Sequence, residues 1–289
     1  WLVAFEKYKQ IPQYKLVNEG MSLSDFKTIF WWEWGHRLLG RIIGVVFALP
    51  LLAFWWRGWL RAGTAGKYAG LLALGAIQGA IGWYMVASGL SERVSVSQYR
   101  LALHLSGALA IFALLVWLAL DERRARLGGS PGIVTGFVRA MAAVMFGLVF
   151  LQTVLGAFVA GLKAGLIYNT WPSMDGQFVP SDYWIEGHGL MSFFEGHAAA
   201  QFNHRMMAYV LLAVALAQTI AILRAGATCA AKLSGFVLLL AIVAQAIIGI
   251  LTLVWHVPLT LGVLHQAGAV AVLGVAVWHL FAVNDARKV

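Results

Sequence analysis

The stretch Leu264-His265-Gln266-Ala267-Gly268-Ala269 repeats an earlier one, Leu103-His104-Leu105-Ser106-Gly107-Ala108. A second echo links Gly35-His36-Arg37 to Asn203-His204-Arg205. The four histidines fall in strongly apolar surroundings, where an ionisable side chain is costly and usually functional. Two matched pairs of histidines therefore predict two bis-histidine metal or haem sites, one in each half of an internal repeat.

The composition indicates a membrane protein. Hydrophobic residues make up 61% of the 289 residues and charged residues only 11%, which is not the composition of a soluble domain. The net charge of +9 does not indicate a nucleic-acid partner, because the basic residues are scattered over short loops. The single cysteine, Cys229, excludes an internal disulfide and a thiolate cluster. We expect a multi-pass protein surrounded by lipid.

Seven apolar stretches are each long enough to cross about 30 Å of hydrocarbon at about 1.5 Å per residue. We predict helices at 35–56, 67–88, 100–120, 134–161, 201–223, 232–255 and 260–283. Basic residues gather at alternate ends of these stretches, within 57–67, 123–139, 224–232 and 287–288. The positive-inside rule makes these ends cytoplasmic. We therefore expect a location in the cell inner membrane, with the histidines toward the periplasmic side.

A third motif supports the repeat. Gln-x-x-(Ile/Leu)-Gly occurs at Gln78–Gly82, Gln152–Gly156 and Gln245–Gly249, and its ends share a helix face. Helix packing is the simplest role for these glutamines and glycines. The second half has a Gln helix, a His-Arg helix, a Gln helix and a Leu-His helix, whereas the first half shows only the last three.

The motif order predicts an all-α protein of two pseudo-symmetric four-helix bundles. We expect that seven helices are covered and that the first helix is missing from this chain. The predicted halves are residues 1–125 and residues 126–289. Four helices per repeat would relate the halves by an axis along the membrane normal.

Two arginines follow the first histidine of each pair. Arg37 and Arg205 either extend to water at the membrane edge or pair bidentately with a haem propionate. We favour propionate pairing. Four further histidines have no echo, and we interpret them as loop or interface residues: His188, His197, His256 and His279.

An acidic residue distinguishes the two halves. Glu33 precedes His36 by three residues, whereas Gln201 holds the equivalent place before His204. This asymmetry predicts a reactive site in the first half and an electron-carrying site in the second. The alternative is that Glu33 is a helix-start carboxylate favoured by the helix dipole.

Several runs of residues resemble heme A synthases of the mitochondrial type. They are 11–27, 30–37, 168–177 and 201–205, and the resemblance extends over essentially the whole chain. It implies eight transmembrane helices in two bundles and oxidation of the C8 methyl group of heme O to a formyl group, which gives the heme A of terminal oxidases. Some members carry a cysteine pair in an outer loop. This chain has none there, so that disulfide is not expected.

The resemblance also implies roles for the residues above. His204 and His265 would ligate a b-type haem cofactor, and His36 and His104 would hold the heme O substrate. We therefore assign metal ligation to these four histidines, haem contacts to Arg37 and Arg205, and catalysis to Glu33, His36 and His104. The implied partners are heme O and heme A, heme O synthase, a terminal oxidase assembly pathway and an electron-transfer partner. The sequence does not identify the last of these and leaves homo-oligomer formation open.

Two other classes of protein also explain two histidine pairs. A quinone-linked di-haem b-type electron-transfer subunit does so, but it explains neither a carboxylate in one half only nor the outer loop at 171–175. A haem transporter or chaperone would need exchangeable ligands and no redox chemistry. Conversion of heme O to heme A separates these classes from the synthase.

Overall fold

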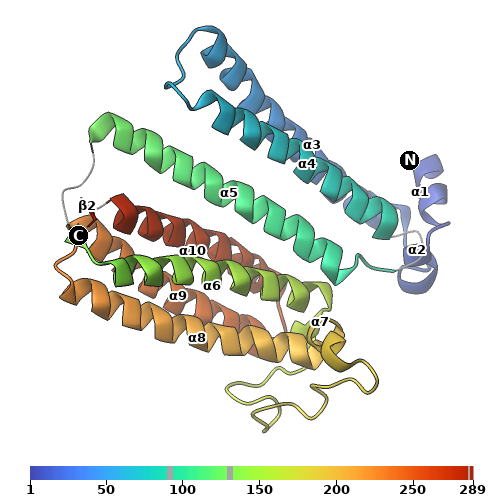
Figure 1. The fold of residues 1–289 in the computed structure, drawn as a ribbon. Coiled ribbons are helices and arrows are strands. Elements are labelled where there is room, and N and C mark those ends of the chain that lie inside the picture. The colour runs from blue at the N-terminus through green and yellow to red at the C-terminus, as the bar shows by residue number, and fades with distance from the viewer. Residues whose placement is uncertain (90–93, 129–132, 286, 289) are drawn as a thin grey trace. The chain divides into compact units, whose positions relative to one another are not determined.

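The computed structural model describes residues 1–89, 94–128, 133–285 and 287–288, and this part of the chain is mostly helical, with a long irregular loop between α6 and α8 (Figure 1). Two 3-10 turns, Ala164–Leu166 and Gly189–Met191, and a two-residue parallel pairing of β1 (Ile133–Val134) with β2 (Arg287–Lys288) accompany the helices. The all-α prediction is confirmed. The helices are α1 (Leu2–Tyr8), α2 (Pro12–Val17), α3 (Leu23–Trp56), α4 (Ala65–Gly89), α5 (Gln98–Leu127), α6 (Gly136–Gly161), α7 (Ser192–Glu195), α8 (His197–Arg224), α9 (Cys229–Val254) and α10 (Leu259–Asp285).

Seven of the described helices, α3, α4, α5, α6, α8, α9 and α10, are long and apolar enough to cross a membrane. They match the seven predicted stretches in order, so the prediction of a multi-pass membrane protein is confirmed. The largest difference lies at α3, which begins at Leu23 instead of residue 35. Its start is a capping box: the Ser22 hydroxyl accepts from the Asp25 backbone N–H at 3.2 Å, and the Asp25 carboxylate accepts from the Ser22 N–H. The predicted start of this helix lies too far along the chain, because the prediction began the helix where the apolar stretch begins.

The chain divides into two compact units, Trp1–Ile111 and Phe112–Val289, and each is described by itself. In the first unit, α3 packs along α4, and an aromatic cluster ties α1 to the start of α3. Phe5 of α1 stacks on Phe26 of α3 with ring centroids 5.1 Å apart. The cluster holds the part of α3 that precedes the candidate site. The predicted boundary between residues 125 and 126 stays a prediction.

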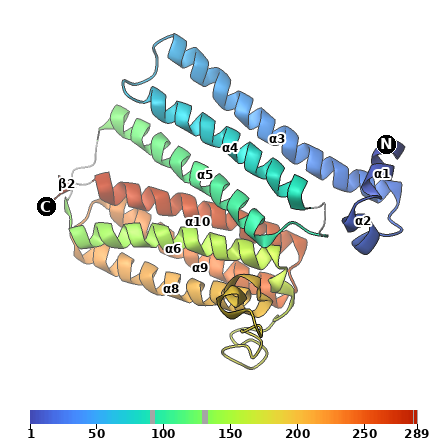
Figure 2. The ribbon, with the colours of Figure 1, turned by 45° about the vertical axis from the view of Figure 1, so that its right-hand side comes forward.

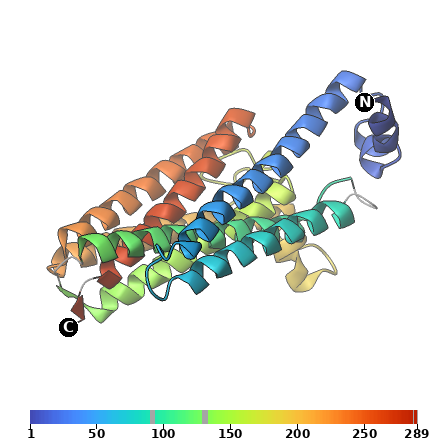
Figure 3. The same ribbon diagram turned by 90° about the horizontal axis from the view of Figure 1, so that it is seen from above.

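In the second unit, α6, α8, α9 and α10 form a closed four-helix bundle (Figures 1 and 2), which Figure 3 shows from above. Each helix packs against two others in the order α6, α8, α9, α10 and back to α6. At one end, Val138, Ile222, Ala231 and Val283 form a buried cluster. This cluster brings together the start of α6, the α8–α9 turn and the end of α10. The basic residues predicted to face the cytoplasm within 224–232 therefore lie at this end.

Candidate functional site

The structure brings the predicted histidines together in two pairs. His36 of α3 and His104 of α5 have ring centroids 6.5 Å apart, with the ring planes at 65°. His204 of α8 and His265 of α10 have centroids 6.4 Å apart at 80°. The first pair lies within the first unit and the second pair within the second unit. Each half of the repeat thus builds the same facing arrangement of two imidazoles.

This arrangement fits a metal held between two histidines. A metal bound to two imidazole nitrogens at about 2.0–2.1 Å from each places the ring centroids about 6 Å apart. Nδ1 of His204 is buried and has no hydrogen-bond partner among the described residues, so one of its ring nitrogens is not committed to the protein. No group of three or more His, Cys, Asp or Glu side chains gathers anywhere in the described ranges. Two axial imidazoles suffice for a haem, because the porphyrin supplies the other ligands.

Each glutamine of the repeated motif contacts one of these histidines. The Gln78 amide donates to the backbone carbonyl of His104 at 2.6 Å, and Gln245 donates to that of His265 at 2.8 Å. Gln152 donates to the carbonyl of His204 at 3.0 Å. The packing interpretation of the motif was therefore incomplete: the glutamines do join helices, but they do so at the candidate ligands.

Glu33 and Arg37 form an ion pair on α3. Arg37 Nη1 lies 3.1 Å from Glu33 Oε1, and both side chains are about half exposed. They are four residues apart and therefore neighbours on one face of the helix. The pair lies directly beside His36 in the sequence. Their predicted roles, a catalytic carboxylate and a propionate-binding arginine, stay predictions.

Arg205 is held very differently from Arg37. Its guanidinium is buried and donates to the backbone carbonyls of Tyr168, Thr170 and Ser173 at 2.8 to 3.2 Å. It also donates to the side-chain oxygen of Gln201 at 3.1 Å. Nε of Arg205 is buried and lacks a partner in the part of the chain that the structure describes. Most of the guanidinium therefore anchors the outer loop, and its predicted contact with a haem propionate stays a prediction.

The outer loop between α6 and α8 is tied to the bundle by a network that the sequence did not indicate. Gln201 donates to the carbonyls of Ala164 and Tyr168, and Asn169 donates to the carbonyl of Leu253 at 2.8 Å. The Tyr168 hydroxyl donates to Asp182. This hydrogen bond to the carboxylate raises the pKa of Tyr168 to about 12. The network fixes the loop to the start of α8, the helix that carries His204.

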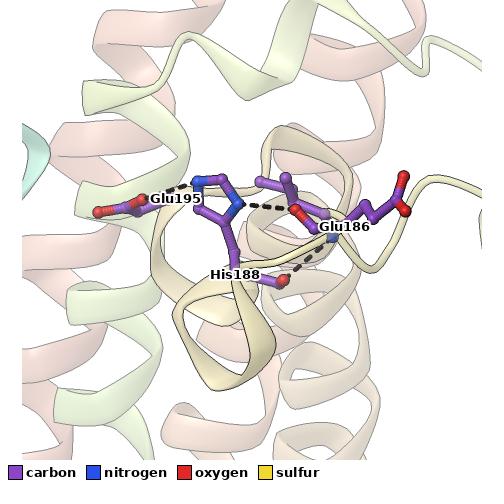
Figure 4. A network of polar contacts seen from close by, with 5 residues as sticks. Glu186, His188 and Glu195 are labelled. Carbon is purple, nitrogen blue, oxygen red and sulfur yellow. Dashed lines mark hydrogen bonds and ion pairs between the residues drawn. The ribbon is translucent and has the colours of Figure 1, made fainter.

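His188 belongs to the same loop (Figure 4). Its Nδ1 faces the backbone oxygen of Glu186 at 3.1 Å, and its Nε2 lies 3.9 Å from the carboxylate of Glu195. Both contacts are local and exposed, so the loop interpretation of His188 agrees with its place. Burial, mainly, raises the pKa of Tyr183 in this loop, and its hydroxyl donates to Asn203 at 3.0 Å.

His279 is a correction, because the sequence suggested a loop or interface residue. It is fully buried in the second unit. Gln218 lies 3.1 Å from its Nε2, and the Ser234 hydroxyl lies 3.0 Å from its Nδ1. Both ring nitrogens are therefore occupied by side chains, as expected of a structural core histidine. The signal that could have found it is its place well inside an apolar stretch.

Comparisons with known proteins identify the family of this chain. The model of a family described as cytochrome oxidase assembly proteins matches residues 1–277. The heme A synthase of Parvibaculum lavamentivorans is 50% identical over 280 residues, which are 97% of this chain and 79% of that protein. The heme A synthase of Rhodopseudomonas palustris (strain BisA53) is 49% identical over 284 residues, which are 97% of this chain and 76% of that protein. With its paired histidines in both halves and this similarity along nearly its whole length, the chain belongs to the heme A synthase family.

Proposed function

We propose that this enzyme oxidises the C8 methyl group of heme O to a formyl group, with His36 and His104 as the substrate-binding histidines. One difference between the two similar histidine pairs carries the proposal. Only the pair in the first unit has a carboxylate, Glu33, one helical turn before a histidine. Written as a half-reaction, R–CH3 + H2O → R–CHO + 4 H+ + 4 e−, the conversion takes up one oxygen atom at the oxidation level of water and releases four protons and four electrons, which an electron acceptor outside the chain must receive. It therefore needs a group that handles protons beside the substrate and a route for electrons.

Glu33 is suited to the proton steps. A carboxylate can take a proton from a reacting group or stabilise positive charge that develops at the methyl carbon. Arg37, whose Nη1 lies 3.1 Å from Glu33 Oε1, holds the carboxylate on the helix face beside His36. His36 and His104, whose rings face each other, would hold the substrate haem through its iron and so position it relative to Glu33.

We further propose that His204 and His265 hold a b-type haem cofactor. When bound, that group supplies one-electron redox chemistry. Arg205 and Gln201 hold the outer loop against this end of the bundle by hydrogen bonds to the loop backbone. The rival electron-transfer subunit would need two rigid sites of this kind, whereas the first unit carries a half-exposed ion pair instead.

The proposal places the histidine pairs toward the periplasmic side of the cell inner membrane, and Cys229 offers a test. This cysteine is exposed at the start of α9, in the turn that we assign to the cytoplasmic face. A membrane-impermeant maleimide should label Cys229 in inside-out vesicles and leave it unlabelled in right-side-out vesicles. The opposite pattern would reverse the orientation.

The activity is tested in cells that make heme O but no heme A. Membranes from cells that also express this chain should contain heme A, identified by extracting the pigments and separating them. Cells that express the His36→Ala variant provide the control, and their extracted pigments should still contain heme O and no heme A. Pigments that stay heme O with the unaltered chain, although haem remains bound to the purified protein, would favour an electron-transfer or transport role and end the proposal.

A further inference from the structure

We propose that the three Gln-x-x-(Ile/Leu)-Gly segments are imidazole cradles, which fix the orientation of a histidine ring on a neighbouring helix. The term imidazole cradle means the glutamine, the glycine four residues later and the histidine between them. The cradles are Gln78 and Gly82 with His104, Gln152 and Gly156 with His204, and Gln245 and Gly249 with His265. The inference rests on the proposed haem ligation and deepens it, since it names residues that act through the ligands.

The glutamine defines one end of the cradle. Gln245 Nε2 lies 2.8 Å from the backbone oxygen of His265 and 3.0 Å from Nδ1 of the same ring. Gln78 repeats this with His104 at 2.6 Å and 3.0 Å. One amide group thus donates to the backbone oxygen and packs against the ring of the same residue, which restricts rotation of the imidazole. With a metal on Nε2, Nδ1 carries the ring proton and does not accept from the amide N–H. Because Nδ1 faces the glutamine, Nε2 is the ring nitrogen that remains for a metal.

The glycine defines the other end. A Cβ built on Gly249 would lie 2.8 Å from Cε1 of His265, and one built on Gly82 would lie 2.8 Å from Cε1 of His104. Both distances are too short for any side chain, so only glycine lets the ring lie against the helix here. The four-residue spacing places the glutamine and the glycine on one helix face, one on each side of the ring.

A second glycine completes the cradles of His104 and His265. Three residues after each histidine stands a glycine, Gly107 and Gly268, and a Cβ there would overlap with the side-chain oxygen of Gln78 or Gln245. This explains why the echoed stretches share Gly as well as His. The Leu-His-x-x-Gly echo and the Gln-x-x-x-Gly motif therefore supply the two helices that contact each other in one imidazole cradle.

The cradle around His204 is looser. Gln152 lies 3.4 Å from Nε2 of His204, whereas the other two glutamines lie against Nδ1, so Nδ1 is the nitrogen of His204 that has no partner among the described residues. A Cβ on Gly156 would lie 3.2 Å from Cε1. Met207 stands where the other two histidines have a glycine. We infer that His104 and His265 are the rigidly oriented ligands of their sites, and that His204 adjusts more readily.

His279 shows what the same contacts do without a free ring nitrogen. Gln218 and Ser234 occupy both nitrogens, and a Cβ on Gly235 would lie 3.3 Å from Cε1. This buried histidine is oriented but has nothing left to offer a metal. It therefore provides a matched control within the second unit.

The cradle is tested by changing Gln245 and Gly249 in the purified haem-containing protein. Gln245→Leu removes both amide contacts, and Gly249→Ala pushes a methyl group into the ring of His265. The orientation of a ligating imidazole, and the contacts of the ring nitrogen that does not bind the metal, here Nδ1 of His265, change the spectrum and the reduction potential of a haem. Both variants should therefore retain the haem while shifting the g values of its low-spin electron paramagnetic resonance signal and its midpoint potential.

The controls are Gln218→Leu, at His279, and Gly262→Ala, whose added Cβ would meet only Val257 at 3.9 Å. Neither should change the spectrum or the potential. The cradle is overturned if His265→Ala loses the haem while Gln245→Leu and Gly249→Ala keep the unaltered signal and potential. If His265→Ala itself keeps the haem unchanged, the ligand assignment of the proposed function fails, and the cradle fails with it.

Discussion

The helical turns that contain His36 in α3 and His204 in α8 carry the same histidine and arginine, but the two arginines make different contacts. Arg37 forms an ion pair with Glu33, and both side chains are about half exposed. Arg205 is buried and divides its hydrogen bonds between Gln201 and three carbonyls of the outer loop. The residue three positions before the histidine makes the difference, since it is an acid in one half and an amide in the other.

The sides of the two sites that His104 and His265 form do not differ in this way. His104 and His265 have the same glutamine contacts and the same pair of close glycines. The two halves are therefore alike at His104 and His265 and differ at His36 on α3 and His204 on α8. The difference between the two sites comes from α3 and α8. The half-exposed carboxylate suits a site where a substrate must enter and react, and the buried hydrogen-bond network suits a site that only passes electrons.

The largest expected effect separates the histidine pairs. His204→Ala and His265→Ala should each abolish or strongly shift the absorption bands of the low-spin haem, because a haem held by two axial imidazoles loses that state with either one. His36→Ala and His104→Ala should leave these bands in place and weaken retention of heme O. Absorption spectra and extracted pigments of the four purified variants check this. Equal loss of the bands in all four would remove the distinction between the sites.

The two arginines should differ in their contribution to stability. Arg205→Lys loses the planar fork that reaches several carbonyls, and we expect the free energy of unfolding to fall by about 2–4 kcal/mol. Arg37→Lys alters a half-exposed ion pair, which is typically worth about 0–1 kcal/mol. Thermal melting in detergent and protease cleavage of the outer loop measure both. Equal melting temperatures for the two variants would contradict the different roles.

The smallest effect concerns the outer loop alone. Asp182→Asn removes the carboxylate that raises the pKa of Tyr168 to about 12, so that pKa should return toward 10.0. A raised tyrosine pKa means that folding favours the protonated form. The stabilisation is therefore present below pH 10 and disappears as the pH rises through about 12. Alkaline absorbance titration detects the shift, and Tyr168→Phe identifies which titration step belongs to this residue.

Much of this comparison could be predicted from the sequence. Apolar length found the seven spans, and the echoes found both histidine pairs, because each signal repeats within the chain. The network around Arg205 could not be predicted, since its acceptors are backbone carbonyls that carry no residue signature. The role of the Gln-x-x-x-Gly motif was visible as a pattern, but its contacts join residues far apart in the sequence. His279 was misplaced because it has no echo, although burial inside a helix was already implied by its apolar surroundings.

The central claim, that Glu33 makes the first site reactive, is tested most directly by Glu33→Gln. This change keeps the shape of the side chain but removes its charge and basicity, and it resembles the amide that the second half carries at Gln201. We predict that the variant folds, keeps the haem of the second unit, and accumulates heme O or its alcohol intermediate in the extracted pigments. Formation of heme A at the unaltered rate would show that Glu33 only forms an ion pair with Arg37 on α3 and would contradict the account.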